Sequence, residues 1–186
     1  LQSKLQKDNA HLVEYFFGNK MIFQFSVSAE KYSFKRIEKD ELFSNTLDRY
    51  LEFFESPSNI SEDVTKFTDT AFQFYKLLEF PNSESKNLIL IPDGLLNFVS
   101  FDALLTNSTT TFQFEKMPFL VHDFNIFQQI SATSYLNSKD IEKQEDPRVL
   151  GVFPVFENTS QELTYSKEEA RTVRRIDNST LLLNED

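Results

Sequence analysis

The stretch Asn87–Leu105, NLILIPDGLLNFVSFDALL, decides the fold of this chain. It opens with the apolar run Leu88–Ile91, and an unbroken run of this length is typical of a strand buried on both faces of a sheet. Pro92 then removes a backbone donor, and Asp93-Gly94 turns the chain. Because a strand buried on both faces needs a layer on each side, the stretch predicts an α/β fold. Open α/β sheets place their sites at the tips of such strands, so any site is expected beside this turn.

The overall composition excludes several classes of function. With 186 residues, 40% of them hydrophobic, the chain can form one substantial domain or two small ones, and no stretch is long enough to span a bilayer. The 29 acidic residues outnumber the 19 basic ones, for a net charge of −10, which argues against nucleic acid and anionic membranes as partners. The sequence has no cysteine, which removes disulfides, thiolate zinc sites and a cysteine nucleophile. This composition fits a reducing compartment, and a cytoplasmic location is expected.

The first third of the chain predicts an antiparallel β-meander. Residues 1–11 are expected to be a polar helical lead-in from an upstream region, and a meander follows over His11–Ile37. Gly18-Asn19 is a two-residue hairpin signal between two apolar runs. In the second run Met21, Phe23, Phe25 and Val27 share one face, and Gln24 and Ser26 share the other, as in a sheet covered on one side. Lys31–Ile37 is more polar and predicts a strand near an edge.

Two amphipathic helices are expected next. Apolar residues recur at helical spacing over Asp40–Glu55, and Ser56-Pro57 predicts the end of that helix. Ser61 is the expected N-cap of the second helix, with Glu62 and Asp63 in its first turn. The second helix presents a regular apolar stripe, and Pro81 lies just past its end. The stripe is formed by Val64, Phe67, Ala71, Phe74 and Leu78.

Shorter elements follow the central strand. Extended pieces are expected over Phe119–Val121 and Phe124–Ile130, and one or two helical turns over Ala132–Lys139. A charged connection over 140–147 leads to a strand, Arg148–Phe153, in which Gly151 marks a close approach to the backbone. A helix over Ser166–Ile176 and a last strand over Leu181–Leu183 complete the chain. The expected architecture is a mixed sheet flanked by helices.

No catalytic constellation is evident from the residues themselves. Asp93 at the end of the buried strand is either a ligand or acid at a site, or simply part of an Asp-Gly turn. His11 and His122 have no neighbouring residues of a nucleophilic or metal-binding motif. The chain has no dinucleotide-binding, P-loop or zinc-binding spacing, and we expect no metal and no cofactor.

Several segments nevertheless resemble a known family, the CHAT domain. This is a caspase-like domain found after tetratricopeptide repeats in bacterial proteins. The specific part of the resemblance is Ile91–Asn97 followed by Phe101–Leu104, and the hairpin after Leu12–Gly18 supports it. Its signature positions here, which we expect to be structural, are Pro92, Asp93, Gly94, Phe101, Leu104, Ser131, Gly151 and Pro154. The sequence departs from the family pattern where Ser100, Ile130 and Thr164 replace prolines.

The resemblance implies a caspase-like α/β fold over residues 12–186, with an N-terminal antiparallel meander. In the family, a catalytic His and Cys lie beyond the strand that Leu181–Leu183 matches, so the chain corresponds to the non-catalytic half. The full-length protein would be a cysteine peptidase regulated by helical repeats. The expected partners are the carboxy-terminal catalytic half and upstream helical repeats. A sheet edge at Leu183 would be exposed, mediate self-association, or bind a partner fragment.

Two functional hypotheses of different classes follow. The first is a structural role as the scaffold half of a caspase-like peptidase domain. The second is a stand-alone peptide- or ligand-binding module with its site beside Asp93, which a deep pocket lined by polar groups would favour. A hydrolase that uses other chemistry has no support in the spacing of Ser, His and Asp.

Overall fold

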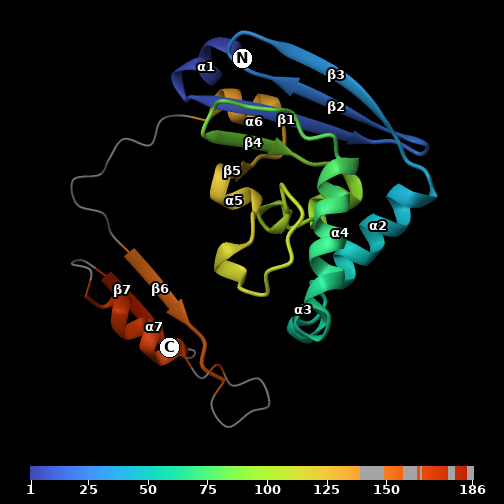
Figure 1. Cartoon of the computed structure of the whole chain (residues 1–186). Helices are drawn as coiled ribbons and strands as arrows, with labels where there is room; N and C mark the ends of the chain where they lie inside the picture. Colours follow the sequence, from blue (N-terminus) through green and yellow to red (C-terminus); the bar gives the residue numbers. More distant parts are fainter. Residues whose placement is uncertain (139–148, 157–162, 164, 176–178, 184–186) are drawn as a thin grey trace. The chain divides into compact units, whose positions relative to one another are not determined.

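The computed structural model describes residues 1–138, 149–156, 163, 165–175 and 179–183 (Figure 1). The chain divides into two compact units, Leu1–Ser138 and Lys139–Asp186, and each is described by itself. The charged connection expected over 140–147, residue 164 and the end of the last helix at residue 176 lie outside the described residues.

The first unit is built on a five-stranded mixed sheet with strand order β3-β2-β1-β4-β5. The pairs β1–β2 and β2–β3 are antiparallel, whereas β1–β4 and β4–β5 are parallel. The strands are β1 (Ala10–Phe17), β2 (Met21–Val27), β3 (Tyr32–Glu38), β4 (Asn87–Ile91) and β5 (Asn125–Gln128). The predicted mixed α/β architecture is therefore confirmed, as are the meander and the edge position of its third strand.

Helices α2 and α4 cover one face of this sheet. They span α2 (Glu41–Glu52) and α4 (Val64–Leu77), with α3 (Pro57–Glu62) between them. Asp40 caps α2 through Oδ1, which accepts the Phe43 N–H at 2.7 Å, and Asp63 caps α4 in the same way from Lys66 at 2.9 Å. Both helices were expected, but Ser61 is wrong as the second N-cap. Pro57 opens α3, because the first helical turn needs no N–H there, and Ser61 lies inside that short helix.

An aromatic core fills the space between these helices and the sheet. Phe43, Tyr50, Phe67 and Phe74 are fully buried and contact one another ring to ring, for example Phe43 and Phe74 with centroids 5.7 Å apart. The Tyr50 hydroxyl donates to the Ser100 carbonyl at 2.7 Å, which satisfies the polar end of a buried ring. Burial raises the pKa of Tyr50 well above its ordinary value, and the nearby Asp102 carboxylate adds to this rise.

Two small helices cover part of the opposite face. They are α1 (Gln2–Lys7) and α6 (Ala132–Asn137), and both contribute side chains to a cluster with β1 and β4. Leu5 of α1 and Tyr135 of α6 pack with Leu12, Ile89 and Ile91 in a second buried cluster. All residues of Leu88–Ile91 are buried, so the prediction of a strand buried on both faces is confirmed. The lead-in therefore contributes to the core through Leu5.

The two helices are also held by polar contacts. The Tyr135 hydroxyl donates to Asp8 Oδ2 at 2.7 Å, and Lys4 Nζ lies 3.3 Å from the same carboxylate oxygen. Lys4 Nζ also lies 5.0 Å from the centre of the Tyr135 ring. These contacts join the end of α1 to α6 on the same face of the sheet.

Compact turns connect β4 to β5 and replace one predicted extended piece. They are η1 (Gly94–Phe98), η2 (Phe101–Ala103), η3 (Phe114–Lys116) and α5 (Leu120–Asp123). The expected extended piece Phe119–Val121 is wrong in most of its length, because the chain turns into α5 after an isolated bridge between Phe119 and Leu105. Leu120 is fully buried there, and its N–H donates to the Leu104 carbonyl at 2.8 Å.

The larger helical layer lies on the side of the sheet opposite to the one that the alternation of apolar and polar residues in β2 predicts. Gln24 and Ser26 are buried with Ile22 under the larger helical layer, whereas Phe23 and Phe25 point to the other face. This part of the other face lies beyond α1 and α6, and Phe25 is exposed. The predicted alternation is correct in period, but its polar side faces the core.

The second unit is a β-α-β motif with two parallel strands. It contains β6 (Val149–Phe153), α7 (Ser166–Val173) and β7 (Ser179–Leu183). A Cβ atom at Gly151 would lie 2.5 Å from Phe153 Cε2 and 3.0 Å from Leu181 Cδ2, which confirms the expected close approach. Leu150 and Val152, the neighbours of Gly151 in β6, are exposed.

Candidate functional site

Asp93, which the sequence predicts at the end of the central strand, stabilises the turn that follows this strand. Asp93 Oδ2 accepts the Phe17 N–H at 2.8 Å, so it joins the end of β1 to the end of β4. Gly94 follows with φ of +57°, and a Cβ atom there would lie 2.9 Å from Phe17 Cβ. Both the conformation and the close approach require glycine at this position.

Most of the other signature residues have packing or capping roles. Phe101 and Leu104 are fully buried in the main core, and the Ser131 hydroxyl caps α6 by accepting the Ser134 N–H at 3.0 Å. Gly151 and Pro154 belong to the second unit, where Pro154 is exposed after β6. The residues that the sequence singled out therefore form no single site: three make the turn, and the others lie in separate parts of the fold.

The surface beside Asp93 is dominated by an exposed aromatic cluster that sequence reasoning did not identify. We call Phe16, Phe23, Phe25 and Phe34 the phenylalanine face, since all four project from the same side of β1, β2 and β3. Their rings contact one another, with centroids 6.1 Å apart for Phe16–Phe23, 5.9 Å for Phe23–Phe34 and 4.9 Å for Phe25–Phe34. The alternation of Phe residues along these strands was the signal that could have identified the cluster, if their side of the sheet had been taken as the uncovered one.

A groove of about 620 Å³ runs along this face to Asp93. The phenylalanine face forms much of its floor, with Ile91, Glu14 and the exposed Ile130 beside it. A groove therefore lies where the sequence predicted a site. Its lining is mainly apolar and not polar as the binding-module hypothesis expected, and exposed apolar surfaces of this kind often mark protein–protein contacts.

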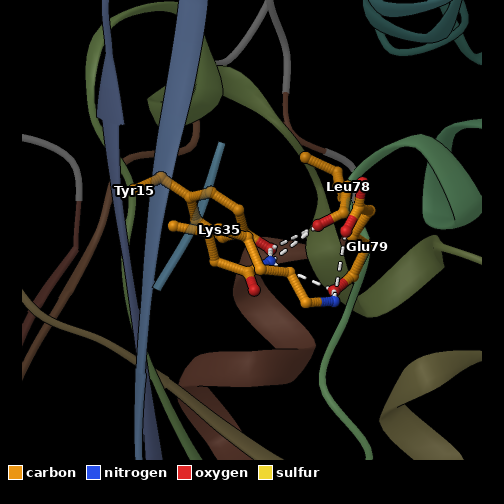
Figure 2. Close-up of polar contacts among 5 residues, drawn as sticks. Tyr15, Lys35, Leu78 and Glu79 are labelled. Carbon is orange, nitrogen blue, oxygen red and sulfur yellow. Dashed lines mark hydrogen bonds and ion pairs between the residues drawn. The ribbon is translucent and has the colours of Figure 1, made fainter. Parts of the chain in front are cut away.

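On the buried side of the sheet, Gln24 is the centre of a polar network. Its Nε2 donates to the Leu78 carbonyl at 2.7 Å, the Glu79 carbonyl at 3.2 Å and the Tyr15 hydroxyl at 3.2 Å. Figure 2 shows Tyr15 and Lys35 reaching toward Leu78 and Glu79, and Lys35 Nζ lies 3.2 Å from Glu79 Oε2. The network holds the end of α4 against β1, β2 and β3.

This network has a structural role. Glu79 has φ of +46°, the left-handed conformation common just after a helix, and its carbonyl accepts from both Gln24 and Lys35. Burial raises the pKa of Tyr15 above its ordinary value, which keeps the hydroxyl protonated as a donor to Leu78. Within the described residues, Gln24 Oε1 is buried and has no hydrogen-bond donor.

The histidines do not form a catalytic site in the part of the chain that the structure describes. His11 Nε2 lies 2.6 Å from Ser26 Oγ, but both side chains are more than nine-tenths buried. No described acid or amide contacts the other ring nitrogen, so nothing orients the ring for base catalysis. His122 is exposed and stands edge-on to Phe119. The His11–Ser26 pair is best explained as a satisfied polar contact inside the sheet layer.

We expect the stability of the protein to fall on mild acidification because of His11. Burial lowers the pKa of His11 below its ordinary value of 6.5. Below pH 6.5 His11 therefore binds a proton more readily in the unfolded chain than in the folded one. The free energy of unfolding consequently decreases as pH falls. Urea unfolding of the protein and of His11→Gln between pH 8 and pH 5 measures this effect. The variant should lose part of the pH dependence, and identical pH profiles would contradict the prediction.

The described residues include neither a metal-binding group nor a membrane-spanning helix. No group of three or more His, Asp or Glu side chains there could hold a metal ion. No helix among those residues combines the length and the apolar character needed to traverse a bilayer.

Comparison with known proteins gives no assignment. No protein-family model matches the chain, and no curated protein matches its sequence. The resemblance to the CHAT domain stays a prediction.

Proposed function

We propose that this chain is the non-catalytic structural half of a caspase-like CHAT peptidase domain. The observation that carries the proposal is the role of Asp93. The carboxylate at the tip of the central strand accepts a backbone N–H and joins two strands, so it is used to hold the fold together. The buried Phe101 and Leu104 and the capping residue Ser131 act in the same structural way. The chain has no cysteine, so a cysteine peptidase would need a nucleophile from elsewhere.

In this proposal the full-length protein is a cysteine peptidase, and the chain supports its catalytic half. The partners are that half, with its His and Cys, and helical repeats upstream. Among the described residues, the outer edge of β5 in the first unit pairs with no further strand, and Leu150 and Val152 in β6 of the second unit are exposed. Each of these surfaces can pack against a further part of the same domain.

The test is to purify the chain alone and together with the catalytic half of the full-length protein. We expect no cleavage of a fluorogenic peptide library by the chain alone. Binding of the catalytic half should raise the thermal midpoint by about 5–10 °C, because a few kcal/mol of interface energy shifts a domain of this size by that much. Peptidase activity should appear only in the mixture.

A catalytic half with its cysteine changed to alanine is the matched control. It should give the same thermal shift and no activity, which separates support of the fold from chemistry. Robust peptidase activity in the chain alone, or a catalytic half that neither binds nor stabilises it, would refute the scaffold role.

A second candidate is a peptide-binding module that uses the groove beside Asp93. The observation in its favour is the open, aromatic floor formed by the phenylalanine face. A chain that is stable alone and indifferent to the catalytic half, but that binds short apolar peptides in a way that Phe25→Ser abolishes, would support this function over the first.

A further inference from the structure

The phenylalanine face is an apolar surface without cover among the described residues of the first unit. Phe16, Phe25 and Phe34 are 57%, 43% and 51% exposed. At about 200 Å² per ring, these three side chains alone expose roughly 300 Å². Tyr32, at 82% exposure, projects from the same side of β3 and enlarges the surface. Aromatic patches of this size on a soluble domain commonly mark a contact with another protein.

The strand register places one acid and one base on opposite corners of this face. Cross-strand pairing sets Glu14 beside Phe25 and Phe25 beside Phe34 in one row. The next row consists of Phe16, Phe23 and Arg36. Glu14 and Arg36 are thus separated by two strand spacings, about 10 Å, and by two residues along the strands, about 7 Å.

Both charges lack partners within the first unit. No ion pair or side-chain hydrogen bond joins Glu14 or Arg36 to any residue that the structure describes. Glu14 is half-buried and lines the groove, whereas Arg36 is exposed at the edge strand. A partly desolvated carboxylate at an aromatic surface is stabilised by a cation brought by whatever covers that surface.

We propose that the phenylalanine face binds the same face of a second copy of this chain. A two-fold axis lying in the interface, along the diagonal from Phe16 to Phe34, brings Glu14 of each copy close to Arg36 of the other. The phenylalanine faces of the two copies then pack on each other. The strands of one copy cross those of the other at a steep angle, as in orthogonal packing of two sheets. The contact is isologous and forms both ion pairs at once. It uses the sheet face rather than the sheet edge, and it does not depend on the proposed function.

A second copy fits this surface better than a partner of one charge sign. The surface carries its own acid and base in positions that the two-fold axis exchanges, so it is complementary to itself. The area is small, at the lower end of protein interfaces, and the net charge of −10 on each copy opposes association. We therefore expect a weak dimer, with a dissociation constant in the micromolar range or above.

Sedimentation equilibrium of the whole chain at physiological salt tests the proposal. The wild-type chain should form dimers as its concentration rises through the micromolar range. Glu14→Arg and Arg36→Glu should each weaken the dimer by about tenfold or more, because each places like charges opposite one another. The double variant carrying both changes should regain most of the wild-type affinity. An equimolar mixture of the two single variants should also dimerise, since their charges are then complementary.

Two further variants test whether association depends on the phenylalanine face or on exposed aromatic rings in general. Phe25→Ser should weaken the dimer, whereas Phe112→Ser, which removes a 67% exposed ring outside the face, should leave it unchanged. A chain that is monomeric throughout the range overturns the proposal. A dimer insensitive to these changes, as expected for pairing through a sheet edge or for another partner surface, overturns it too. The proposal is also overturned if both single variants lose dimer affinity and neither the double variant nor the mixture restores it.

Discussion

Gly94→Ala is expected to lower the free energy of unfolding by about 3 kcal/mol, the sum of left-handed backbone strain and a steric clash. The φ of +57° at this position is costly for any residue with a Cβ atom. The new Cβ would also lie 2.9 Å from Phe17 Cβ and 3.0 Å from Phe17 Cγ. Phe17 cannot move away easily, because its backbone N–H donates to Asp93 on one side and it pairs with Ile22 of β2 on the other.

Urea unfolding of Gly94→Ala, Gly94→Asn and Leu95→Ala separates the two causes. Asparagine tolerates the left-handed conformation, so Gly94→Asn should recover up to about 1 kcal/mol of the loss and retain the cost of the clash. Leu95 is the next residue and is nearly half exposed, so its replacement should change stability by less than about 1 kcal/mol. A Gly94→Ala protein as stable as the wild type would show that the turn does not need glycine.

The sequence predicted the structure best where a residue pattern is compatible with only one arrangement of the chain. Four consecutive apolar residues in β4 can be satisfied only by cover on both faces, and the structure supplies α4 with its neighbours on one face and α1 with α6 on the other. Asp40 and Glu41 begin α2 as the helix pattern predicted, because the apolar spacing and the cap agree. The turn residues Pro92, Asp93 and Gly94 were likewise expected, since few residues allow such a turn.

Sequence reasoning failed where the outcome depends on contacts distant in the chain. Gln24 is buried because Leu78 and Glu79, more than fifty residues later, supply carbonyls that its amide satisfies. Phe25 is exposed because α2 and α4 lie on the other side of the sheet, and α1 and α6 do not reach it. Alternation gives the period of a strand but not which side receives the larger layer, so the phenylalanine face could not be located from β2 alone.

The candidate site was predicted in position but not in character. Asp93 does lie beside a groove, as expected for the tip of a central strand. The chemistry of that groove is set by side chains on β1, β2 and β3 that come together only through strand register. A pattern within one segment cannot reveal them, because each strand contributes only one or two of the rings.

The amide of Gln24 is expected to be as important to the fold as any apolar core residue. Gln24→Glu conserves shape but replaces the donor that serves the Leu78 and Glu79 carbonyls with a carboxyl group. An ionised carboxylate facing two carbonyls in a buried site is strongly unfavourable, so its pKa should rise above the usual value of about 4.3. Keeping it protonated at pH 7 costs up to about 3.7 kcal/mol, since each pKa unit is worth about 1.36 kcal/mol. We expect a loss of about 3–4 kcal/mol in the free energy of unfolding at pH 7.

The sign of the pH dependence makes this prediction specific. A carboxyl group with a raised pKa in the folded state contributes its stability below about pH 4.3 and loses it as pH rises toward the folded-state pKa. The difference between the Gln24→Glu variant and the wild type should therefore shrink to about 1–2 kcal/mol at pH 4, where a protonated carboxyl still donates one hydrogen bond. Gln113→Glu, at an exposed position, adds the same charge and should stay close to the wild type at both pH values. Equal losses for Gln24→Glu at pH 4 and pH 7 would contradict the prediction, and would show that water or the Lys35 ammonium stabilises the new carboxylate.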